Sequence, residues 1–408
     1  MEKIYVIQPI TQENAKKYRV LQEEAVSLIE SAGAVYAGTI YQNIREINPA
    51  TYIGYGKLQE LNERLADLEE ITVLFNGDLS PSQTLNISAA LGERKVIDRT
   101  TLILDIFAKN AKSSEGKLQV EYAQLKYIYP RLKGKGLALS RLGGGVGTRG
   151  PGETQLETDR RYIRGRLHYL EKRLKEIEQR RSLQTERRQK EQVKTIALVG
   201  YTNTGKSTLL KRLTGADTYI KNELFATLDP TARTFEIDDI PFLLVDTVGF
   251  LQDLPHHLIE SFKSTLESAI HCDLALIVCD ATGEFDMQMQ TTLQTLQEMQ
   301  FSSPYLLVMN KCDSLSDTSA LPKDSVCISA REDLGIDGLK RAILQKFQDE
   351  FFFCELYVPY QKMHEYAAIK HHAIERNITY TDEGQTVSVV IPTRYTQLFQ
   401  PFIQSLKQ

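Results

Sequence analysis

Along residues 1–106, short apolar runs alternate with amphipathic stretches. The apolar runs, which are typical of strands, are Ile4–Ile7, Val35–Thr39, Val73–Phe75 and Val96–Ile97. The amphipathic stretches, which favour helices, lie around Glu13–Ser31, Leu58–Leu68 and Ser82–Leu91. Strands that alternate with helices predict βαβ units and a parallel sheet. This part of the chain contains no phosphate-binding glycine motif.

Two heptad-like apolar stripes follow. The first consists of Leu118, Tyr122, Leu125, Tyr129 and Leu132, and the second of Ile163, Leu167, Leu170, Leu174 and Ile177. Each stripe is too short for an independent coiled coil, so the pair predicts an antiparallel helical hairpin whose stripes face each other. The second helix, from about Glu153 to Gln192, would reach roughly 60 Å at about 1.5 Å per residue and form a projecting arm.

The connection between these helices is rich in glycine. It runs from Leu139 to Arg161 and is longer than a helical hairpin needs. Glycine lets the backbone approach a partner closely and arginine suits RNA phosphates, so we favour contact with RNA over a flexible linker. The candidate RNA-contact residues are Arg141, Gly143, Gly144, Gly145, Gly147, Arg149, Gly150 and Gly152.

A nucleotide-binding motif begins after the second predicted helix. The strand-like run Thr195–Val199 leads into GYTNTGKS at residues 200–207, and a helical stretch follows. This is the P-loop pattern in the strand–loop–helix context that it requires. Its glycines let backbone N–H groups surround phosphates at a helix N-terminus, where the helix dipole favours anions. Lys206 would place its charge between the β- and γ-phosphates, and the Ser207 hydroxyl could bind Mg²⁺.

Motifs further along the chain predict that the base is guanine. Asp246 ends an apolar strand, where it could hold Mg²⁺ through water, and the N–H of Gly249 could sense the γ-phosphate. Asn310, Lys311 and Asp313 follow another apolar strand, at the edge where open α/β sheets bind ligands. Asp313 could accept hydrogen bonds from N1–H and the 2-amino group of guanine. Adenine lacks these donors and would leave the carboxylate unpaired.

The segment Phe225–Thr234 is predicted to contain the switch threonine that closes on Mg²⁺ when the γ-phosphate is present. Thr227, Thr231 and Thr234 are all candidates, and their spacing does not choose among them.

Two further positions concern the rate of hydrolysis. Phe250 follows Gly249, where many GTPases carry a water-orienting Gln, and an apolar side chain cannot orient the attacking water. We therefore expect slow intrinsic hydrolysis that a partner stimulates. Asn203 is either a neutral loop residue or, as in several GTPases, a ligand for an activating potassium ion.

Composition and charge restrict the class of protein. Of the 408 residues, 42% are apolar and 25% are charged, which is ordinary for globular proteins and excludes collagen-like and disordered chains. The five scattered cysteines contain no CxxC pair and indicate reduced thiols. With no long apolar run, we expect a cytoplasmic protein without a membrane span.

The distribution of charge is uneven. Residues 126–192 contain 18 Lys and Arg against 8 Asp and Glu, a net charge of +10, whereas the whole chain has a net charge of −4. A local positive charge in an acidic protein suits a polyanion such as RNA, although a solvated helical surface would show the same count.

The combination of GGGVGTRGPGETQLETDRR, GYTNTGKS, FATLDPT, DTVGF and NKCD resembles the HflX family of ribosome-associated GTPases. The resemblance covers about residues 1–350, and it implies binding to the large ribosomal subunit, an arm directed at ribosomal RNA, and the splitting of stalled or idle ribosomes. It also implies that Thr227 is the switch threonine on Mg²⁺.

Together, the motifs and the resemblance predict the site. The catalytic residues are Lys206, Thr227 and Gly249, and the Mg²⁺ ligands are Ser207, Thr227 and, through water, Asp246. The residues predicted to contact GTP are Gly200, Tyr201, Thr202, Asn203, Thr204, Gly205, Lys206, Ser207, Thr208, Phe225, Ala226, Thr227, Leu228, Asp229, Asp246, Thr247, Val248, Gly249, Asn310, Lys311, Cys312, Asp313, Ser329, Ala330 and Arg331.

The predicted fold class is α/β with four parts. They are an N-terminal parallel α/β domain (1–110), a helical hairpin arm (111–192), a P-loop GTPase domain (193–350) and a small C-terminal α+β domain (351–408). The last part predicts a strand at Glu355–Val358, a helix at Lys362–Ala373, a hairpin around Asp382–Gly384 and a final helix near Tyr395–Leu406. Its histidines, and His256 and His257, are interpreted as structural or surface residues.

Three functions compete. A monomeric, GTP-driven factor that splits or rescues ribosomes is favoured by the glycine-rich loop and the local positive charge. A signalling switch would use the arm to dock soluble protein effectors. An ATP-dependent RNA remodeller is disfavoured by Asp313, which predicts guanine.

Overall fold

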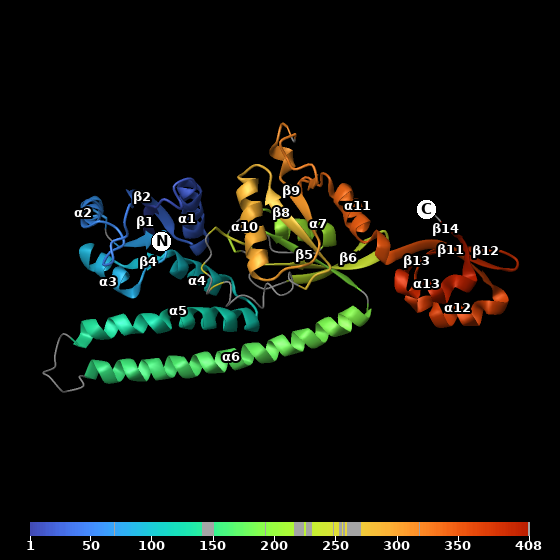
Figure 1. Ribbon diagram of the computed structural model, residues 1–408, viewed down its shortest axis with the longest axis horizontal. Helices are drawn as coiled ribbons and strands as arrows, with labels where there is room; N and C mark the ends of the chain where they lie inside the picture. The colour runs from blue at the N-terminus through green and yellow to red at the C-terminus, as the bar shows by residue number, and fades with distance from the viewer. Residues whose placement is uncertain are drawn as a thin grey trace.

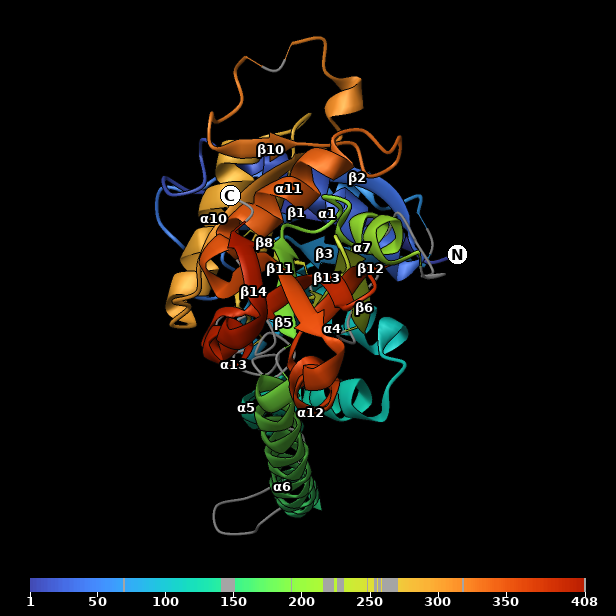
Figure 2. The same ribbon diagram turned by 90° about the vertical axis from the view of Figure 1, so that its right-hand side faces the viewer.

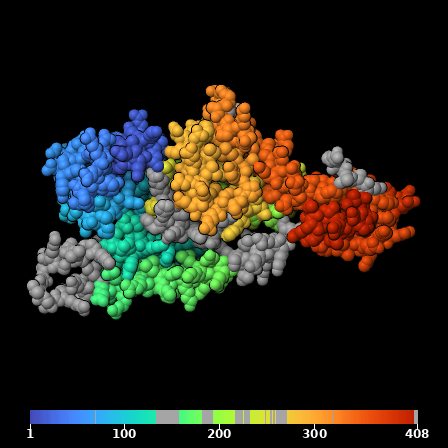
Figure 3. Space-filling view, viewed as in Figure 1, coloured from blue at the N-terminus to red at the C-terminus, as the bar shows by residue number. Residues whose placement is uncertain are grey.

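The computed structural model describes residues 1–68, 70–140, 151–191, 193–215, 224–225, 231–247, 249–252, 255, 258, 271–317 and 319–406. Three sheets follow one another along the molecule, and a long helical hairpin lies along one side of the first two (Figure 1). Seen from the C-terminal end, the hairpin hangs below the sheets (Figure 2). The surface view shows the three sheet-containing parts in contact in chain order (Figure 3).

The N-terminal sheet is entirely parallel, with the order β2-β1-β3-β4. Its strands are β1 (Lys3–Ile10), β2 (Val35–Asn43), β3 (Ile71–Phe75) and β4 (Val96–Asp98). The helices between and after them are α1 (Tyr18–Ala32), α2 (Tyr55–Arg64), α3 (Pro81–Ala90) and α4 (Arg99–Asn110). Apolar side chains fill both faces of this sheet, as a parallel sheet with crossover helices requires. The predicted βαβ units are therefore confirmed.

The arm consists of α5 (Ser114–Ser140) and α6 (Pro151–Glu191), which run antiparallel. Arg166 of α6 forms a two-bond ion pair with Glu121 of α5, at 2.6 and 2.8 Å. The predicted apolar stripe of α5 is only half-buried, because Val120, Ala123 and Tyr127 on another side of α5 pack into the core with α4. The hairpin prediction is confirmed. The sequence indicated that α5 packs against one helix, α6, whereas α5 packs against both α6 and α4.

The central sheet has six strands in the order β10-β9-β8-β5-β7-β6, and only the edge strand β6 is antiparallel. The strands are β5 (Lys194–Gly200), β6 (Thr231–Ile237), β7 (Ile240–Asp246), β8 (Leu274–Asp280), β9 (Tyr305–Asn310) and β10 (Ser325–Cys327). The described helices around it are α7 (Lys206–Thr214), α10 (Phe285–Glu298), the short 3-10 helix η1 (Cys312–Ser314) and α11 (Ile336–Lys346). This order brings the ends of β5, β7, β8 and β9 to one edge.

The C-terminal sheet is antiparallel, with the order β12-β13-β11-β14. It contains β11 (Phe351–Pro359), β12 (Ile374–Tyr380), β13 (Gly384–Pro392) and β14 (Ile403–Leu406), with the short helices α12 (Met363–Ile369) and α13 (Thr396–Phe399). The predicted final helix is wrong in its second half, where β14 pairs with β11. Pro401 explains the difference, because proline lacks the N–H that would continue the hydrogen bonding of an α-helix beyond α13.

Candidate functional site

The P-loop lies where β5 meets α7, in the predicted strand–loop–helix order. Gly205 precedes α7 with a φ of 93°, and a Cβ added there would lie 2.2 Å from Asn310 Nδ2. Gly200 has a φ of 149°, and a Cβ there would lie 2.3 Å from the carbonyl oxygen of Val278. Both positions therefore require glycine, and the loop presents the N-terminus of α7, which attracts phosphate.

Lys206 begins α7 and is almost fully buried. Its Nζ donates to the carbonyl oxygens of Gly200 at 3.1 Å and Tyr201 at 2.5 Å, both within the loop. Burial lowers the pKa of Lys206 to about 8, and the nearby Asp246 carboxylate offsets part of this effect. A phosphate anion would compensate a buried ammonium group of this kind.

Ser207 and Asp246 form an oxygen-rich pair beside the P-loop. The Ser207 hydroxyl donates to Asp246 Oδ2 at 2.8 Å, and Asp246 is buried at the end of β7, the strand next to β5. A hydroxyl and a carboxylate are hard oxygen donors, which Mg²⁺ prefers, so the donor set fits this ion.

Gly249 follows β7 and packs closely against the P-loop. A Cβ at Gly249 would lie 2.8 Å from Thr202 Cα and 3.0 Å from Lys206 Nζ. Phe250 donates its N–H to the Gly200 carbonyl oxygen at 3.1 Å, and its own carbonyl accepts from the N–H of Thr202 at 2.8 Å. Its side chain is buried in the apolar core, so the ring stabilises the packing of this segment.

Asn310 connects two loops on the other side of the site. Its Nδ2 donates to the Thr204 carbonyl oxygen at 2.8 Å, and its Oδ1 accepts from the N–H of Ala330 at 3.0 Å. Asp313 lies in η1, where a hydrogen bond from the Ser329 side chain is the main cause that lowers the pKa of its carboxyl group. An ionised Asp313 is an acceptor only, as recognition of two guanine donors requires.

Family comparisons agree with this geometry. Residues 20–108, 110–188 and 195–311 match family models described as "GTP-binding GTPase N-terminal", "GTP-binding GTPase Middle Region" and "50S ribosome-binding GTPase". The chain is 44% identical to the GTPase HflX of Caldanaerobacter subterraneus subsp. tengcongensis, covering 94% of this chain and 90% of that protein. It is 49% identical to the GTPase HflX of Alkalihalophilus pseudofirmus, covering 79% of this chain and 77% of that protein.

This chain belongs to the HflX family of GTPases. It is therefore a GTP-hydrolysing enzyme, and the predicted family and reaction are confirmed. Among solved structures, it is similar to a GTP-binding protein from Sulfolobus solfataricus in complex with GDP, at 25% identity and a TM-score of 0.45. That match covers 86% of this chain and 99% of the other chain.

Several predicted site residues of this HflX-family chain lie outside the described residues: Ala226, Thr227, Leu228, Asp229, Val248 and the loop from Arg141 to Gly150. His256 and His257, which we interpreted as structural residues, also lie outside them. Gly152 lies in the first turn of α6. Thr231 and Thr234, the alternatives to Thr227, lie in β6. In the described ranges, no helix has the length and apolar character needed to cross a membrane, and no group of three His, Cys, Asp or Glu could hold a metal.

One charged partner in the site was missed from the sequence. Asp280 ends β8, and its Oδ2 lies 2.5 Å from the Nζ of Lys311, which has a φ of 66°. The ion pair draws the Lys311 ammonium toward β8. The available signal was the carboxylate at the end of the apolar strand that neighbours β9.

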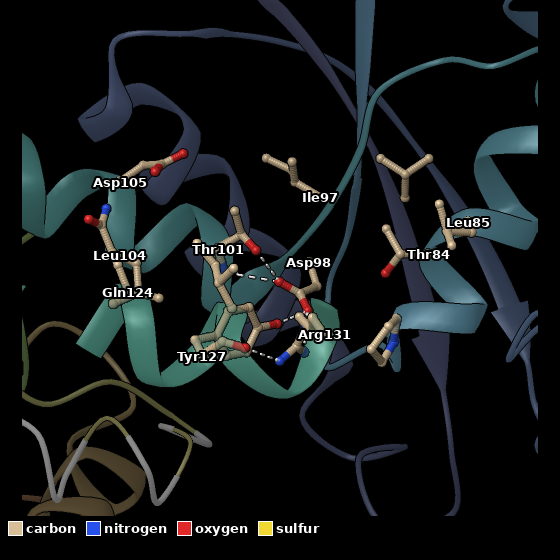
Figure 4. Close-up of a pocket in the computed structure, with 13 residues that line it drawn as sticks. Thr84, Leu85, Ile97, Asp98, Thr101, Leu104, Asp105, Gln124, Tyr127 and Arg131 are labelled. Carbon is tan, nitrogen blue, oxygen red and sulfur yellow. Dashed lines mark hydrogen bonds and ion pairs between the residues drawn. The ribbon is translucent and has the colours of Figure 1, made fainter. Parts of the chain in front are cut away.

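A separate cavity of about 220 Å³ lies between α3, β4, α4 and α5 (Figure 4). Its most buried polar group, Asp98, accepts hydrogen bonds from Tyr127 and from the backbone and hydroxyl of Thr101 at 2.9 and 2.6 Å, and lies 3.4 Å from Arg131. Asp98 therefore has its partners within the protein, and this network holds α5 against the N-terminal sheet.

Proposed function

We propose that this HflX-family GTPase binds the large ribosomal subunit and uses GTP binding and hydrolysis to split or rescue stalled or idle ribosomes. Support comes from residues 195–311, which match a family model described as a 50S ribosome-binding GTPase. Residues 126–192, with a net charge of +10, include all of α6 and the second half of α5. An RNA-rich particle would attract that charge.

The observation that carries this proposal is the combination of positive charge and exposed aromatic rings on α6. Tyr162 is 72% exposed and Tyr169 is 49% exposed. The Arg166 guanidinium lies 5.1 Å from the centre of the Tyr169 ring. Exposed aromatic rings beside arginine can stack on unpaired RNA bases while the charge binds phosphates. A purely structural arm would not need large aromatic side chains in solvent.

Within the nucleotide site, we propose the following roles. Lys206 binds the β- and γ-phosphates, Gly249 donates its N–H to the γ-phosphate, and Asp313 selects guanine. Ser207, Asp246 and Thr227 would hold Mg²⁺, which, when bound, neutralises charge on the phosphate oxygens. The contacts of Lys206, Ser207 and Asp313 described above support these assignments.

The proposed mechanism places no water-orienting side chain after Gly249. Phe250 is apolar and only 2% exposed, so its ring belongs to the core. Intrinsic hydrolysis is therefore slow, and ribosome contact accelerates it by reorganising the segments around the γ-phosphate. Potassium beside Asn203 is a second proposed source of acceleration.

We also propose that residues 1–110, 111–192, 193–350 and 351–408 act as four functional parts of a monomer in the cytoplasm. The three sheets lie within residues 1–110, 193–350 and 351–408, and the arm lies within residues 111–192.

Binding to purified large subunits tests this function directly. The protein should cosediment with them in the presence of a non-hydrolysable GTP analogue, less with GDP, and less as salt rises. Light scattering should report dissociation of whole ribosomes under the same conditions. As a control, Asp313→Asn should lose splitting with GTP and regain it with XTP. Retained GTP binding without cosedimentation would favour the alternative function, a switch for soluble protein effectors.

The glycine-rich loop has its own test. Arg141→Ala combined with Arg149→Ala should weaken subunit binding and reduce the salt slope by about one counterion for each lost phosphate contact. Affinity for GTP should not change. Arg341→Ala with Lys346→Ala removes the same charge from α11, away from the arm, and serves as the matched control. Equal effects of the two double variants would indicate a non-specific charge effect and return the loop to the role of a linker.

A further inference from the structure

Helix α4 of the N-terminal part holds the segment that follows Gly249. Gln252, three residues further on, is bonded through both of its backbone groups. Its carbonyl oxygen accepts from Arg99 Nη2 at 3.2 Å, and its N–H donates to the Tyr201 hydroxyl at 2.8 Å. Arg99 belongs to α4, 153 positions earlier in the sequence. The position of the chain after Gly249 is therefore set partly by a side chain of α4, in the N-terminal part.

Arg99 is itself rigidly held. Its side chain is 6% exposed, and Nη2 lies 2.6 Å from Glu24 Oε2 of α1. Nη1 donates to Asn76 Oδ1 at 3.0 Å, and Asn76 in turn donates to Gln8 Oε1 of β1 at 2.6 Å. A buried, charge-paired arginine with bonds to two side chains has little freedom to move. It can therefore fix the Gln252 carbonyl oxygen, which it contacts after the end of β7.

The N-terminal part also holds the segment that leads to Thr227. Asn110, at the end of α4, donates to the Phe225 carbonyl oxygen at 2.9 Å, and the N–H of Leu224 donates to Ser31 Oγ of α1 at 2.9 Å. The rings of Phe107 and Phe225 meet edge to face at 4.5 Å. Phe225 has a φ of 56°, a conformation that is costly for a residue with a Cβ. Such strain persists only where neighbouring contacts impose it.

We propose that helices α1 and α4 of the N-terminal part position both segments proposed to contact the γ-phosphate, with Arg99 as the positioning residue for the chain after Gly249 and Asn110 as the positioning residue for Phe225, two residues before Thr227. This deepens the proposed function, because it rests on the roles proposed there for Gly249 and Thr227. Each residue acts through the backbone carbonyl oxygen that it holds. Tyr127 of α5 donates a hydrogen bond to Asp98, which directly precedes Arg99 in the sequence. The arm is therefore connected to Arg99 through the peptide bond between these two residues.

The proposal predicts a specific kinetic signature. GDP has no γ-phosphate, so loosening either segment should leave GDP affinity unchanged. The hydrolysis rate should fall because Gly249 or Thr227 is less often in place when GTP is bound. Side chains that act through a bonded network change such coupling by about two- to thirtyfold. A variant that merely destabilised the fold would weaken both nucleotides together.

The test uses the full chain without ribosomes. Removing Arg99 alone would leave the Glu24 charge buried, so the main variant is Glu24→Met with Arg99→Met, since apolar residues of similar volume often replace a buried pair without loss of stability. The second variant, Asn110→Ala, removes one amide at the end of α4. The matched control is Glu60→Met with Arg64→Met, which removes an Arg–Glu pair at 2.6 Å on α2 of the same N-terminal part. Thermal melting, GDP affinity and single-turnover hydrolysis are measured for each.

We expect folded variants with GDP affinity within about twofold of the parent, and rates reduced by about two- to thirtyfold in both test variants but not in the control. Unchanged or faster hydrolysis in both variants would overturn the proposal. If the double variant does not fold, Asn110→Ala decides. Gly249→Ala tests the proposed function separately from the role of Arg99. A Cβ there would lie 2.8 Å from Thr202 Cα and would displace the backbone N–H. If this variant hydrolyses GTP normally, the proposed role of Gly249 is wrong, whatever the Arg99 variant shows. Ribosome binding enters none of these measurements.

Discussion

The two sides of the nucleotide site are supported differently. On the proposed guanine side, Asn310 bonds to Thr204 and Ala330, and Asp313 bonds to Ser329, so these partners come from the central sheet and its loops. On the γ-phosphate side, the backbones of Phe225 and Gln252 accept hydrogen bonds from Asn110 and Arg99 of the N-terminal part.

This difference matches what each side has to do. Base recognition is the same with GTP and with GDP, and a rigid, self-contained frame suits it. The segments proposed to contact the γ-phosphate would have to respond to hydrolysis, and such switches work by changing contacts with a neighbour. Because that neighbour also holds the arm, through Asp98 and Tyr127, the two ends of the proposed ribosome response share one support.

The strongest test of the guanine side is Asp313→Asn. An amide would present a donor where guanine also presents one, so GTP affinity should fall by about a thousandfold or more, as for sites that reject ligands lacking matched hydrogen bonds. XTP should bind better than GTP, because its ring reverses the pairing. Competition with labelled GDP measures both affinities. Wild-type affinity for GTP in this variant would mean that another residue selects the base.

On the phosphate side, the affinity for GDP should depend on pH through Lys206. Burial lowers the pKa of Lys206 to about 8, so the charged form that binds phosphate is lost as pH rises through this value in the free protein. Bound phosphate raises that pKa again, and affinity for GDP should therefore be constant below about pH 7.5 and fall by up to about tenfold per pH unit above 8.

Titration of GDP binding from about pH 7.5 to about pH 9.5 checks this, since phosphate groups are fully ionised over that range. Lys206→Met should bind weakly at every pH and show no such slope. If the parent protein also shows no slope, the buried ammonium is not the group that senses phosphate.

The sequence predicted that the proposed guanine-side residues lie at the ends of neighbouring strands, because each one stands at or just after the end of its own apolar run. Asn310 ends β9 and Ser329 lies two residues after β10, and a parallel sheet brings such ends together. Their individual contacts with nucleotide stay predictions, as do the domain boundaries. The predicted hairpin was also confirmed, because its periodicity is local.

The support of the γ-phosphate side could not be predicted in the same way. The contact between Arg99 and Gln252 spans 153 positions and depends on how two sheets pack, which no local pattern encodes. The final helix was wrong for a related reason. Residues 403–406 pair with β11, some fifty residues earlier, and Pro401 was the one local signal against a helix.

A smaller effect on the guanine side should follow from Asp280→Asn. This change removes the charge that draws Lys311 toward β8, and a partly exposed ion pair contributes up to about 1 kcal/mol, or about two- to fivefold in affinity. GDP affinity should weaken by that factor while the preference for guanine over xanthine is retained, since Asp313 is intact. The control is Asp317→Asn, which removes a carboxylate from the loop that follows η1. An equal loss of GDP affinity in this variant would show that Asp280 has no specific role.

The smallest expected effect separates two explanations for Asn203. Its φ of 59° lies in the left-handed region, which asparagine tolerates better than most residues, so the backbone alone could account for it. Asn203→Gly preserves that conformation and removes the side-chain oxygen.

If the Asn203 side-chain oxygen helps to hold potassium beside the phosphates, hydrolysis by the parent should be about two- to fivefold faster in KCl than in NaCl, because a cation there would offset developing charge. The glycine variant should then run at the sodium rate in both salts. Equal rates of the parent protein in the two salts would leave only the backbone explanation, and faster hydrolysis in potassium by both proteins would place the ion elsewhere.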